Sequence, residues 1–427
     1  ARSSLFLPFK KLGMIIVDEE HDQSFKQDEG VIYNARDMAI SRASFEDIPI
    51  LLVAAVPSLE TFNHIKNKKY NHTSLVKRYN DVSLPEAIVI NLNEEKIEKD
   101  HFISSKTLKI VSDYLDKKEQ VLFFLNRRGY APFLICKKCG FKHVCPNCSI
   151  YLTYHKSINK LICHHCGLKS NKEKKCIDKK NNCDFRLHGP GVEKIYDELK
   201  SIFPNKNIEI FSSDFLSKKE KTETIIKKIE ANKIDIIIGT QLISKGFNFP
   251  KLNCIVVVDA DFSGMGYDLR TTEKNIQLYN QLSGRAGRFS NKSTIVYQTA
   301  HPFNETLGEV LENNPEKFLE NELLVRQKKN LPPFSRLIAL ILSSQSSQES
   351  HRAAQEIKKR LIKIGDLEVL GPIESPIFKI KKRFRTRLLL RTKKNVLIQK
   401  NIRKIIDNLT ISKKIKLTVD VDPINFS

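Results

Sequence analysis

Cysteines are concentrated in one short segment of this chain, at spacings that suit a metal ion. Eight of the nine cysteines lie between residues 136 and 183. They form three Cys-x-x-Cys pairs and a fourth, wider pair: Cys136 and Cys139, Cys145 and Cys148, Cys163 and Cys166, and Cys176 and Cys183. A two-residue spacer lets both sulfurs of a pair reach one ion, and four thiolates complete one tetrahedral zinc site. The segment therefore predicts two Zn²⁺ ions with all eight of these cysteines as ligands.

Disulfide bonds are the alternative explanation of the cysteine pairs. The chain opens with no signal peptide and has no apolar run long enough to span a membrane. We therefore expect a cytoplasmic protein without a membrane partner, in a reducing compartment where disulfides seldom persist. Four nearby histidines could replace a sulfur, but we expect them at the surface: His143, His155, His164 and His165. The ninth cysteine, Cys254, lies in an apolar run and is expected to be buried and inert.

A run of acids followed by histidine could bind a metal nucleotide. Asp18-Glu19-Glu20-His21 directly follows the apolar stretch Met14 to Val17, which is expected to be a strand. Ligands of open α/β sheets gather at the carboxyl ends of strands. There Asp18 would hold Mg²⁺, directly or through water, and Glu19 would orient and deprotonate the attacking water. The alternative is an exposed acidic turn, although three acids followed by histidine favour the functional interpretation.

A second chemical motif is Gln281-Leu282-Ser283-Gly284-Arg285-Ala286-Gly287-Arg288. On a helix, Arg285 and Arg288 would project from one side, where they could reach the phosphates of a nucleotide bound to a facing domain. A solvated basic helix face is the alternative, but glycines are costly inside a helix and argue for close packing. Gln281, Arg285 and Arg288 therefore join Asp18 and Glu19 as candidate catalytic residues, and the two arginines and two acids are the candidate ATP ligands.

Length and charge limit the function classes. The chain has 427 residues, enough for about three domains with hydrophobic cores. Lysine and arginine outnumber the acids by 72 to 49, which gives a net charge of +23 and favours a polyanionic partner such as nucleic acid. Part of that excess can reflect a general drift of composition toward lysine, so the charge serves only as support.

Short β-branched apolar runs alternate with longer amphipathic segments up to residue 300, which is typical of parallel strands with crossover helices. The expected strands are Met14 to Val17, Ile50 to Val56, Val121 to Leu125, Ile234 to Ile238, Ile255 to Val258 and Ser293 to Tyr297. After the fourth of them, the stretch Gly239 to Gly246 suits a phosphate or nucleic-acid contact. The fold class is therefore α/β. The cysteine segment interrupts this alternation without an apolar core, so a metal must hold it together.

A further domain is expected after the turn signal Leu331-Pro332-Pro333, which follows a helix near residues 314–329. Its expected order is a strand at 337–342, a helix at 348–364, strands near 367–370 and 387–390, a helix at 396–409 and a strand at 415–421. Two helices on a small mixed sheet give an α+β domain. Its basic segment from Lys379 to Lys394 carries the candidate DNA contacts Lys381, Lys382, Arg383, Arg385 and Arg387. The alternative is a strand edge protected by charge.

These motifs resemble those of superfamily 2 helicases, and the cysteine segment narrows the resemblance to the primosomal protein N-prime (PriA) family of replication-restart DNA helicases. The resemblance is carried by Arg2 to Phe9, Asp18 to His21, Ala35 to Asp37, Asn126 to Tyr130 and Asp420 to Pro423. It implies two RecA-like lobes, the first of them incomplete. Residues 1–105 would be the remainder of the first lobe, 106–330 the second lobe with a zinc-binding insertion at 135–185, and 331–427 a carboxyl-terminal α+β domain that binds DNA or partners.

The resemblance also implies an activity and partners. A member of that family would be an ATP-dependent helicase that moves 3′ to 5′ along DNA, recognises stalled or collapsed forks and initiates primosome assembly. Its partners would be forked and single-stranded DNA, primosome proteins and single-stranded DNA-binding protein, and we expect a monomer. The family nests the cysteine pairs, so that the first and fourth pairs share one zinc and the two middle pairs share the other. Cysteine order alone leaves a sequential pairing open.

In the same way, the resemblance places a loop that couples DNA binding to ATP hydrolysis after the acidic box. Its candidate DNA contacts here are Phe25, Lys26 and Tyr33. An aromatic side chain there can stack on a base, or it can belong to the core. Asp259-Ala260-Asp261 imitates a second metal box, and we expect it to be structural.

Three features depart from the family pattern. Ala54 to Ser58 stands where the family has Ser-Ala-Thr-Pro-Ser, so that only Ser58 keeps its hydroxyl. Phe247 and Asn248 replace the usual His and Asp, which weakens the expected DNA or coupling role of that loop. The spacer between Cys176 and Cys183 has six residues rather than two, which makes Cys176 the least typical ligand.

A Gly-x-x-x-x-Gly-Lys-Ser/Thr loop, which cradles the β and γ phosphates, does not occur in the 427 residues. We expect it upstream of Ala1 together with an amino-terminal DNA-binding domain, so this chain alone is expected to be inactive. The alternative hypothesis is a catalytically eroded, zinc-containing primosome scaffold that binds forks without ATPase activity. The intact acidic box and arginine motif argue for the motor, and the coding sequence upstream of Ala1 would distinguish the two.

Overall fold

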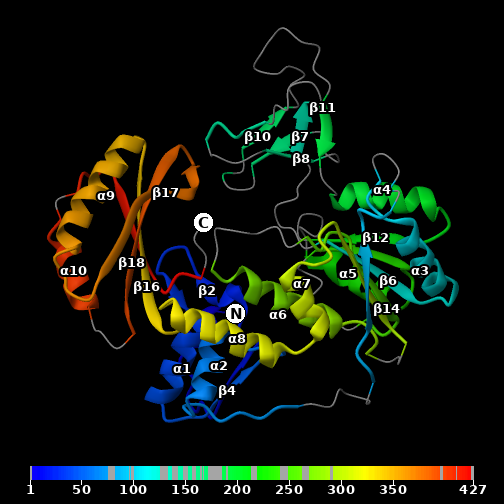
Figure 1. Cartoon of the computed structure of the whole chain (residues 1–427), viewed down its shortest axis with the longest axis horizontal. Helices are drawn as coiled ribbons and strands as arrows, with labels where there is room; N and C mark the ends of the chain where they lie inside the picture. The colour runs from blue at the N-terminus through cyan, green and yellow to red at the C-terminus, as the bar shows by residue number, and fades with distance from the viewer. Residues whose placement is uncertain are drawn as a thin grey trace, which may run out of the picture.

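The computed structural model describes three parts of the chain and portions of a cysteine-rich insertion (Figure 1). The described residues are 2–75, 82–95, 97, 101–125, 133–136, 143–147, 152–155, 160–163, 166, 168–171, 185–188, 191–212, 219–240, 249–261, 269–288, 292–394, 398–409 and 411–424. Several predicted features lie outside these residues: the motif Asn126 to Tyr130, the stretch 241–248, His164, His165, and Cys139, Cys148, Cys176 and Cys183.

The first part is built on a two-stranded parallel sheet. Strand β1 (Ile15–Asp18) pairs with β4 (Ile50–Val53), which places Asp18 beside Val53. Helices α1 (Ala35–Phe45) and α2 (Leu59–Lys66) begin after Asn34 and Ser58, whose side chains accept hydrogen bonds from amides of the first turn. Short elements around them are η1 (Arg2–Phe6), η2 (Gln23–Phe25) and the paired strands β2 (Lys26–Gln27) and β3 (Tyr33–Asn34). The predicted strand at 50–56 thus ends at Val53, where the chain turns toward the Ser58 cap.

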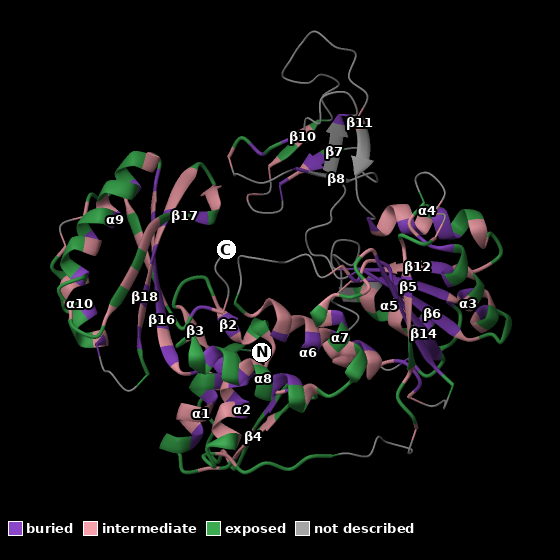
Figure 2. Cartoon of the chain, in the orientation of Figure 1, coloured by how far each residue is buried: buried purple, intermediate pink, exposed green. Residues whose placement is uncertain are grey.

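The second part is a six-stranded parallel sheet in the order β12-β13-β6-β14-β15-β5. Its strands are β5 (Glu86–Asn91), β6 (Gln120–Phe124), β12 (Ile208–Phe211), β13 (Ile236–Gly239), β14 (Leu252–Val257) and β15 (Thr294–Thr299). Helices α3 (Ser105–Asp116) and α4 (Val192–Ile202) pack on one face, and α5 (Lys219–Glu230), α6 (Thr271–Ser283) and α7 (Glu305–Glu312) on the other. The central strands are therefore buried on both faces (Figure 2). This confirms the prediction of an α/β fold from continuous β-branched apolar runs.

Strand β5 corrects the predicted domain boundary. It comes before α3 in the chain, yet it pairs with β15 along its whole length, from Glu86 with Thr294 to Asn91 with Thr299. The boundary predicted at residue 105 is therefore wrong, since this edge of the second sheet begins at Glu86. Strand β5 lies at the edge of the sheet, where only Ile90 of its residues is buried, and its apolar run Ala87 to Ile90 is shorter than those of the central strands β6 and β14.

The third part has the order strand, helix, two strands, helix, strand. Its elements are β16 (Ser335–Ser344), α9 (Ser347–Leu361), β17 (Glu368–Ile380), β18 (Arg383–Lys393), α10 (Gln399–Asp407) and β19 (Lys416–Val421). All neighbouring strands in the order β17-β18-β16-β19 are antiparallel, which is the ferredoxin-like arrangement. The predicted mixed sheet is therefore wrong, while the predicted α+β class is confirmed. Both helices cover one face, where Leu340, Leu388 and Ile402 contribute to the core.

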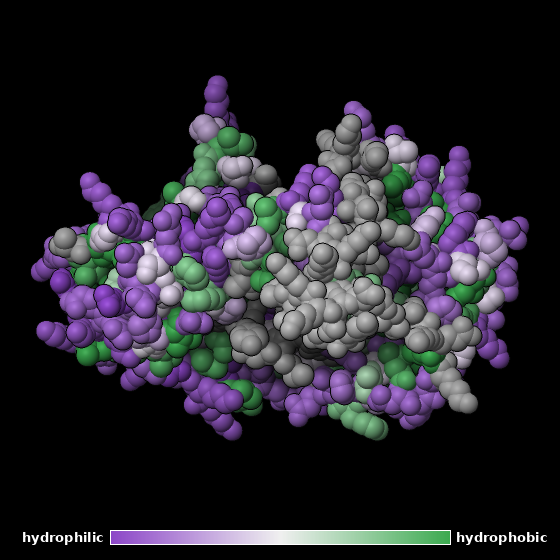
Figure 3. All heavy atoms as spheres, turned by 90° about the horizontal axis from the view of Figure 1, so that it is seen from above, coloured by the Kyte–Doolittle hydropathy of each residue, from purple (hydrophilic) through white to green (hydrophobic). Residues whose placement is uncertain are grey.

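Helix α8 (Pro315–Lys328) leads into this third part and packs against α2 of the first part. Phe318 and Leu319 on α8 join Leu59 and Phe62 on α2 in one apolar cluster. The visible face in Figure 3 is mainly hydrophilic over the described residues, as expected from the large excess of lysine. Among the helices that the structure describes, none combines the length and the apolar character that crossing a membrane requires.

Candidate functional site

The acidic box lies at the carboxyl end of β1, as predicted. Asp18 is the last residue of β1 and is exposed, and its Oδ1 accepts a hydrogen bond from the Glu19 amide at 3.0 Å. Glu19 has a left-handed φ of 50°, and its carbonyl accepts from the Asp22 amide at 2.7 Å. This tight turn gives the two acids different positions: the Asp18 carboxylate faces solvent, where a hydrated Mg²⁺ can reach it, while Glu19 is half-buried.

Glu20, the third acid, has a structural position. Its side chain is 2% exposed, and its two carboxylate oxygens accept hydrogen bonds from the Ser58 amide at 2.6 Å and the Ser58 hydroxyl at 3.0 Å. Arg36 Nη1 donates to Glu20 at 3.0 Å and to Ser58 Oγ at 2.7 Å. Burial works against the charge of Arg36, but the carboxylates of Asp37 and Glu20 outweigh it and raise its pKa. Glu20 thus joins the acidic box to the start of α2.

The start of α2 in turn contacts the second part of the molecule. The Leu59 amide donates to Glu273 Oε1 on α6 at 3.0 Å. Arg270, just before α6, holds the Glu60 carboxylate with both terminal nitrogens, one of them at 3.0 Å. Burial tends to raise the pKa of Glu60, but the Arg270 guanidinium overcomes this effect and lowers it. A partly buried polar network therefore joins the two parallel sheets through α2 and α6.

The altered motif Ala54 to Ser58 lies at this junction. Val56, which stands where the family pattern has threonine, is 1% exposed and packs in one apolar cluster with Ile276 on α6. Gln277 donates to the Pro57 carbonyl at 3.4 Å. At this position the chain therefore has an apolar contact between its two sheets in place of a hydroxyl group.

The acidic box also meets the arginine motif directly. Gln281 Nε2 lies 3.2 Å from His21 Nε2, and the same histidine nitrogen lies 3.7 Å from Glu19 Oε2. Arg285 is close enough for Glu19 and Asp18 to act on its charge. Burial, and then the positive charge of Arg288, lower the pKa of the Arg285 guanidinium, against the opposing effect of these two acids. The predicted catalytic residues of the two sheets are therefore brought together.

The conformation predicted for the two arginines is wrong. Helix α6 ends at Ser283, and residues 284–287 form turns rather than a further helical turn. Gly287 has a left-handed φ of 65°, and its amide donates to the Leu252 carbonyl at 3.1 Å. Gly284 is the C-cap of the helix, and a residue in the left-handed conformation of Gly287 cannot continue a helix. Arg285 and Arg288 thus project from the turn that ties α6 to β14.

The second acidic pair, Asp259 and Asp261, is structural, as predicted. The Asp261 carboxylate accepts hydrogen bonds from the amides of Ala300 and His301 at 3.0 and 3.2 Å, and from the Thr299 hydroxyl. Asp259 Oδ1 accepts from the Asp261 amide at 3.0 Å. The Asp261 carboxylate thus holds the end of β15 and the residues that follow it, and Asp259 fixes the turn that leads to Asp261.

The insertion brings described cysteines from two of the predicted pairs together. Its strands are β7 (Phe133–Cys136), β8 (Thr153–His155), β9 (Lys160–Ile162), β10 (Lys169–Asn171) and β11 (Phe185–His188). The sulfurs of Cys145, Cys163 and Cys166 lie within 4.8 Å of one another, and Cys145 and Cys166 are separated by 3.7 Å, too far for a disulfide. Three converging thiols are suitable ligands for Zn²⁺. This grouping matches the second site of the nested pairing, in which Cys148 would be the fourth ligand.

Cys136 is placed apart from that group. It pairs across the strands β7 and β11 with Phe185, two residues after Cys183 in the chain. Such a position agrees with a first site that combines the outer cysteine pairs. No described cysteine is in a disulfide. The two-site hypothesis and the ligands Cys139, Cys148, Cys176 and Cys183 stay predictions.

We expect metal analysis to find two zinc ions per chain, and replacement of Cys145 by serine to lower this number to one. The serine hydroxyl is a much poorer zinc ligand than a thiolate, so the site loses its closure. Cys254 provides the matched control, because it is fully buried and burial raises the pKa of its thiol to about 12. Cys254→Ser should leave both zinc ions in place. A wild-type content of one zinc would contradict the two-site hypothesis.

The predicted DNA contacts after the acidic box differ in accessibility. Phe25 is half-buried, and the half-buried Tyr33 ring packs edge-on against Phe6 with the ring centroids 5.3 Å apart. Lys26 is only 4% exposed, and its Nζ lies 2.7 Å from Asp420 Oδ1 in the third part of the molecule. The predicted DNA contact of Lys26 is therefore not supported, since its ammonium group is already used inside the protein.

The predicted DNA segment of the third part forms a hairpin whose tip touches the insertion. Lys381 and Lys382 make the turn between β17 and β18 with left-handed φ values of 48° and 64°. The Lys382 amide donates to the Asn147 carbonyl at 2.7 Å, and Lys379 Nζ donates to the Pro146 carbonyl at 3.0 Å. Ile380 packs against the apolar cluster that contains Cys145 and Cys163. The tip is thus an internal contact beside the cysteine group.

The three arginines of this segment share the face of the sheet that carries no helix. Arg383 donates to the carbonyls of Ser343 and Lys414 at 2.5 and 2.7 Å, so its guanidinium is already used within the domain. Burial lowers the pKa of Arg385, and burial and Arg385 lower that of Arg387. Two partly desolvated cations placed side by side suit an anionic ligand. Contacts of Arg385 and Arg387 with a phosphate backbone stay a prediction.

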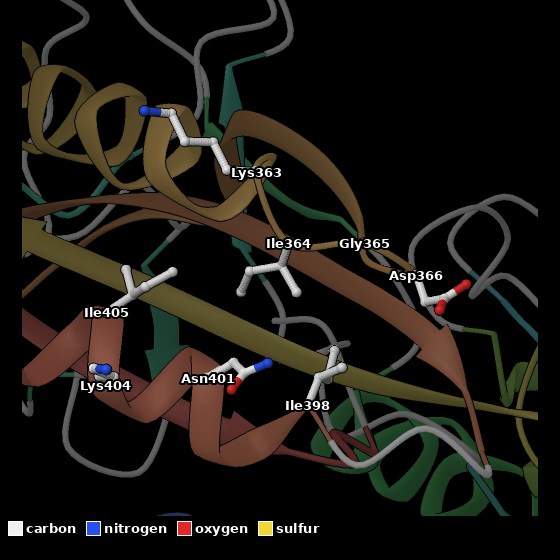
Figure 4. Close-up of a pocket in the computed structure, with 8 residues that line it drawn as sticks. All are labelled: Lys363, Ile364, Gly365, Asp366, Ile398, Asn401, Lys404 and Ile405. Carbon is white, nitrogen blue, oxygen red and sulfur yellow. The ribbon is translucent and has the colours of Figure 1, made fainter.

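Two hollows lie elsewhere in the described structure. One, of about 170 Å³, lies where the three parts meet and is lined by Arg36, Glu60, Arg270, Arg336 and Asp422, among others. Another, of about 540 Å³, lies between the end of α9 and α10 and is lined by Ile364, Asp366, Ile398, Asn401 and Lys404, among others (Figure 4). Neither includes Asp18, Glu19 or Arg285, so neither is the candidate site for chemistry.

Sequence reasoning identified the acids and arginines but missed the residues that hold them. The family-like pattern Ala35-Arg36-Asp37 signalled Arg36 without its partner Glu20. In the same way, the family-like pattern Asp420 to Pro423 signalled Asp420 without its partner Lys26. The interaction of Glu273 with the Leu59 amide had no signal in the sequence, because the two residues are separated by 214 positions.

Three family models match parts of the sequence. The "Helicase conserved C-terminal domain" matches residues 159–290, which include β13, β14, α6 and the arginine motif. The "PriA DNA helicase Cys-rich region (CRR) domain" matches residues 145–170, and the "Primosomal protein N C-terminal domain" matches residues 327–424. A parallel sheet whose helix α6 leads to an arginine motif against an acidic box is, together with these matches, typical of the helicase class of proteins.

Curated relatives cover the whole chain. It is 39% identical to replication restart protein PriA of Rickettsia conorii over 426 residues, 40% to that of Rickettsia felis over 429 and 35% to that of Haemophilus influenzae over 429. The chain belongs to the family of replication restart proteins called PriA. It spans 66%, 66% and 58% of the length of these relatives. Among solved structures, S. cerevisiae Dbp5 bound to RNA and ADP BeF3 aligns over 75% of this chain and 64% of that chain, with 13% identity and a TM-score of 0.38.

Proposed function

We propose that this chain supplies the chemistry of an ATP-dependent 3′ to 5′ DNA helicase. The observation that carries the proposal is the meeting of the acidic box with the arginine motif, at the His21 and Gln281 contact of 3.2 Å. In this proposal Asp18 and Glu19 lie on one side of a bound nucleotide, and Arg285 and Arg288 lie on the other. The network from Glu20 through Ser58 to α6 keeps these two sides in register.

Each candidate residue has a role that its geometry supports. Asp18, open to solvent, would hold Mg²⁺ with the β and γ phosphates of ATP. Glu19 would orient and deprotonate the attacking water, and His21 and Gln281 would position that carboxylate. Arg285, with a charge already under the influence of both acids, would stabilise the charge that develops on the transferred phosphoryl group, and Arg288 would neutralise neighbouring phosphates.

The proposed substrate is forked DNA with a single-stranded segment. Half-buried Phe25 and Tyr33 are placed after the acidic box, where stacking on a base could affect Glu19. Arg385 and Arg387 would contact phosphates. On the strength of the family, we further propose that the protein works as a cytoplasmic monomer, binds two zinc ions, recognises stalled or collapsed forks and initiates primosome assembly with primosome proteins and single-stranded DNA-binding protein.

A second candidate is a primosome scaffold without ATPase activity. It is favoured by Val56, which packs in one apolar cluster with Ile276 where the family pattern has a hydroxyl. The meeting of Asp18, Glu19 and Arg285 favours the motor, because a scaffold has no use for this arrangement.

The two candidates predict different turnover. The protein would be produced with whatever its coding sequence specifies before Ala1, and ATP hydrolysis would be measured with and without forked DNA. The motor predicts DNA-stimulated turnover, abolished by Glu19→Gln, and unwinding with 3′ to 5′ polarity. Lack of turnover together with tight fork binding would favour the scaffold. The 427-residue chain alone is expected to bind DNA without hydrolysing ATP, because its sequence lacks the phosphate loop.

A further inference from the structure

Lys26, which follows the acidic box in the chain, contacts the third part of the molecule. Its Nζ lies 2.7 Å from Asp420 Oδ1 and donates to the carbonyls of Val421 and Asp422 at 2.7 and 3.2 Å. Asp420 and Val421 end β19, the last strand of the ferredoxin-like domain, and Asp422 follows directly; the Val421 carbonyl is 395 positions away in the chain. Two protons of the ammonium group thus go to carbonyl oxygens, and the Asp420 carboxylate adds an ion pair. Lys26 is thus fixed by the third part of the molecule.

The position of Lys26 links this contact to the proposed chemistry. Lys26 begins β2, directly after Phe25, and lies one short turn and η2 beyond His21. Its own carbonyl accepts a hydrogen bond from Arg2 at 2.7 Å. The segment that runs from Glu19 to Tyr33 is therefore held at its midpoint by Asp420.

The same end of β19 also reaches the second sheet. Lys274 Nζ on α6 donates to the Ile424 carbonyl at 3.1 Å. Helix α6 carries Gln281 and leads to Arg285. Asp420 therefore contacts the loop after the acidic box, and Ile424, four residues later in the chain, contacts the helix that leads to the arginine motif.

Asp420 faces the same side of its sheet as the candidate phosphate ligands. It lies beside Ala339 on β16, whose other neighbour is Leu389 on β18, whereas Leu340 and Leu388 point to the helices. Arg387 is two residues from Leu389 and therefore also lies on the face without helices. Across β16, Arg385 and Arg387 lie level with Lys416 and Thr418 at the start of β19, so a ligand bound there would face the strand whose other end carries Asp420.

We propose that Lys26 and Asp420 form a latch through which the ferredoxin-like domain positions the loop after the acidic box. Lys26 and Asp420 are positioning residues: they touch neither nucleotide nor water and act through Phe25, His21 and Glu19. A phosphate backbone on the face that carries Arg385 and Arg387 shifts β19, and the latch transmits this shift to the loop. The inference rests on the proposed ATPase function and adds to it the route by which the third part of the molecule acts.

The test is a double-mutant cycle in the protein with its complete coding sequence. Lys26→Met, Asp420→Leu and the double variant that combines these two substitutions each break the same contact. Each is expected to lower kcat of DNA-stimulated ATP hydrolysis about tenfold with KM for ATP within about twofold, and the double variant should be no worse than the single ones. The double variant replaces a buried ion pair by apolar groups and should fold as stably as the wild type. Lys400→Met on α10, which covers the other face of the sheet, and Asp366→Asn change exposed residues, serve as the matched controls and should change nothing.

Hydrogen exchange of residues 22–34 gives a second measurement that does not need turnover. Loss of the latch should raise exchange in this segment about tenfold in all three variants, without changing exchange in the core of the second sheet. A wild type without DNA-stimulated turnover but with latch-dependent exchange would reject the proposed function and keep the latch. An active wild type whose variants keep full kcat and wild-type exchange would overturn the latch and keep the function.

Discussion

Replacing Arg285 with alanine is expected to lower kcat for ATP hydrolysis about a thousandfold, the effect typical of an arginine that stabilises phosphoryl transfer. The physical reason is the position of its charge. Burial and Arg288 make the guanidinium costly to keep charged, and this cost is offset when the γ-phosphate arrives. Because the interaction is strongest in the transition state, KM for ATP should change far less than kcat.

Steady-state hydrolysis with saturating forked DNA measures this effect. Arg285→Lys separates charge from geometry: it keeps a positive charge but cannot form the two parallel hydrogen bonds of a guanidinium, so most of the loss should remain. Arg352→Ala, an exposed arginine on α9, is the control. Turnover of Arg285→Ala within about fivefold of the wild type would remove Arg285 from the proposed site.

The second large effect concerns the junction between the two sheets. Arg270→Met should lower the free energy of unfolding by about 3–5 kcal/mol at neutral pH, because it leaves the partly buried carboxylates of Glu60 and Glu273 without their shared cation. Burial already raises the pKa of Glu273 despite the nearby arginines. Equilibrium urea unfolding measures this change. Arg403→Met, which removes a solvent-exposed ion pair with Asp407, should have little effect.

The loss should also depend on pH in a defined direction. In the wild type the pKa of Glu60 is lowered, so its ion pair stabilises the fold above the unfolded pKa of about 4.3, and this stabilisation is lost as the pH falls through the folded pKa. Without Arg270, burial would raise the pKa of Glu60, which favours the protonated folded state in acid. The difference between variant and wild type should therefore narrow between about pH 7 and about pH 4. A difference that widens on acidification would contradict this account of the pair.

The sequence reveals features whose signal is local. The parallel strands could be predicted because burial on both faces requires continuous apolar runs such as Ile255 to Val258, and the acidic box because it directly follows one of them. The end of α6 was also within reach, since Gly284 and Gly287 are typical helix-ending residues. Their interpretation as packing glycines inside a helix led to the wrong conformation for Arg285.

Partner choice over long distances could not be predicted in the same way. Lys26 is one of many lysines in the chain. Neither the hydrophobic pattern around it nor the composition indicates that it is buried against Asp420. Glu20 was included in an acidic run, although its environment makes it a structural residue beside two candidate catalytic ones. The role of each carboxylate depends on the groups that the tertiary fold places beside it. Glu20 lies beside Arg36 and the Ser58 amide, whereas Asp18 faces water.

The hairpin tip on the cysteine group gives the insertion an influence beyond its own fold. Pro146 and Asn147, whose carbonyls accept hydrogen bonds from Lys379 and Lys382, directly follow Cys145, so a metal ion held by the cysteine group would fix these carbonyls as well. A zinc chelator should therefore release the tip of the hairpin formed by β17 and β18, and it should also destabilise the cysteine-rich insertion. A bound metal would then determine how strongly the third part is attached to the insertion. This attachment is remote from the contact between Lys26 and Asp420. Two attachment points of unlike chemistry, one ionic and one metal-supported, would allow this part to be freed at one end while it stays held at the other.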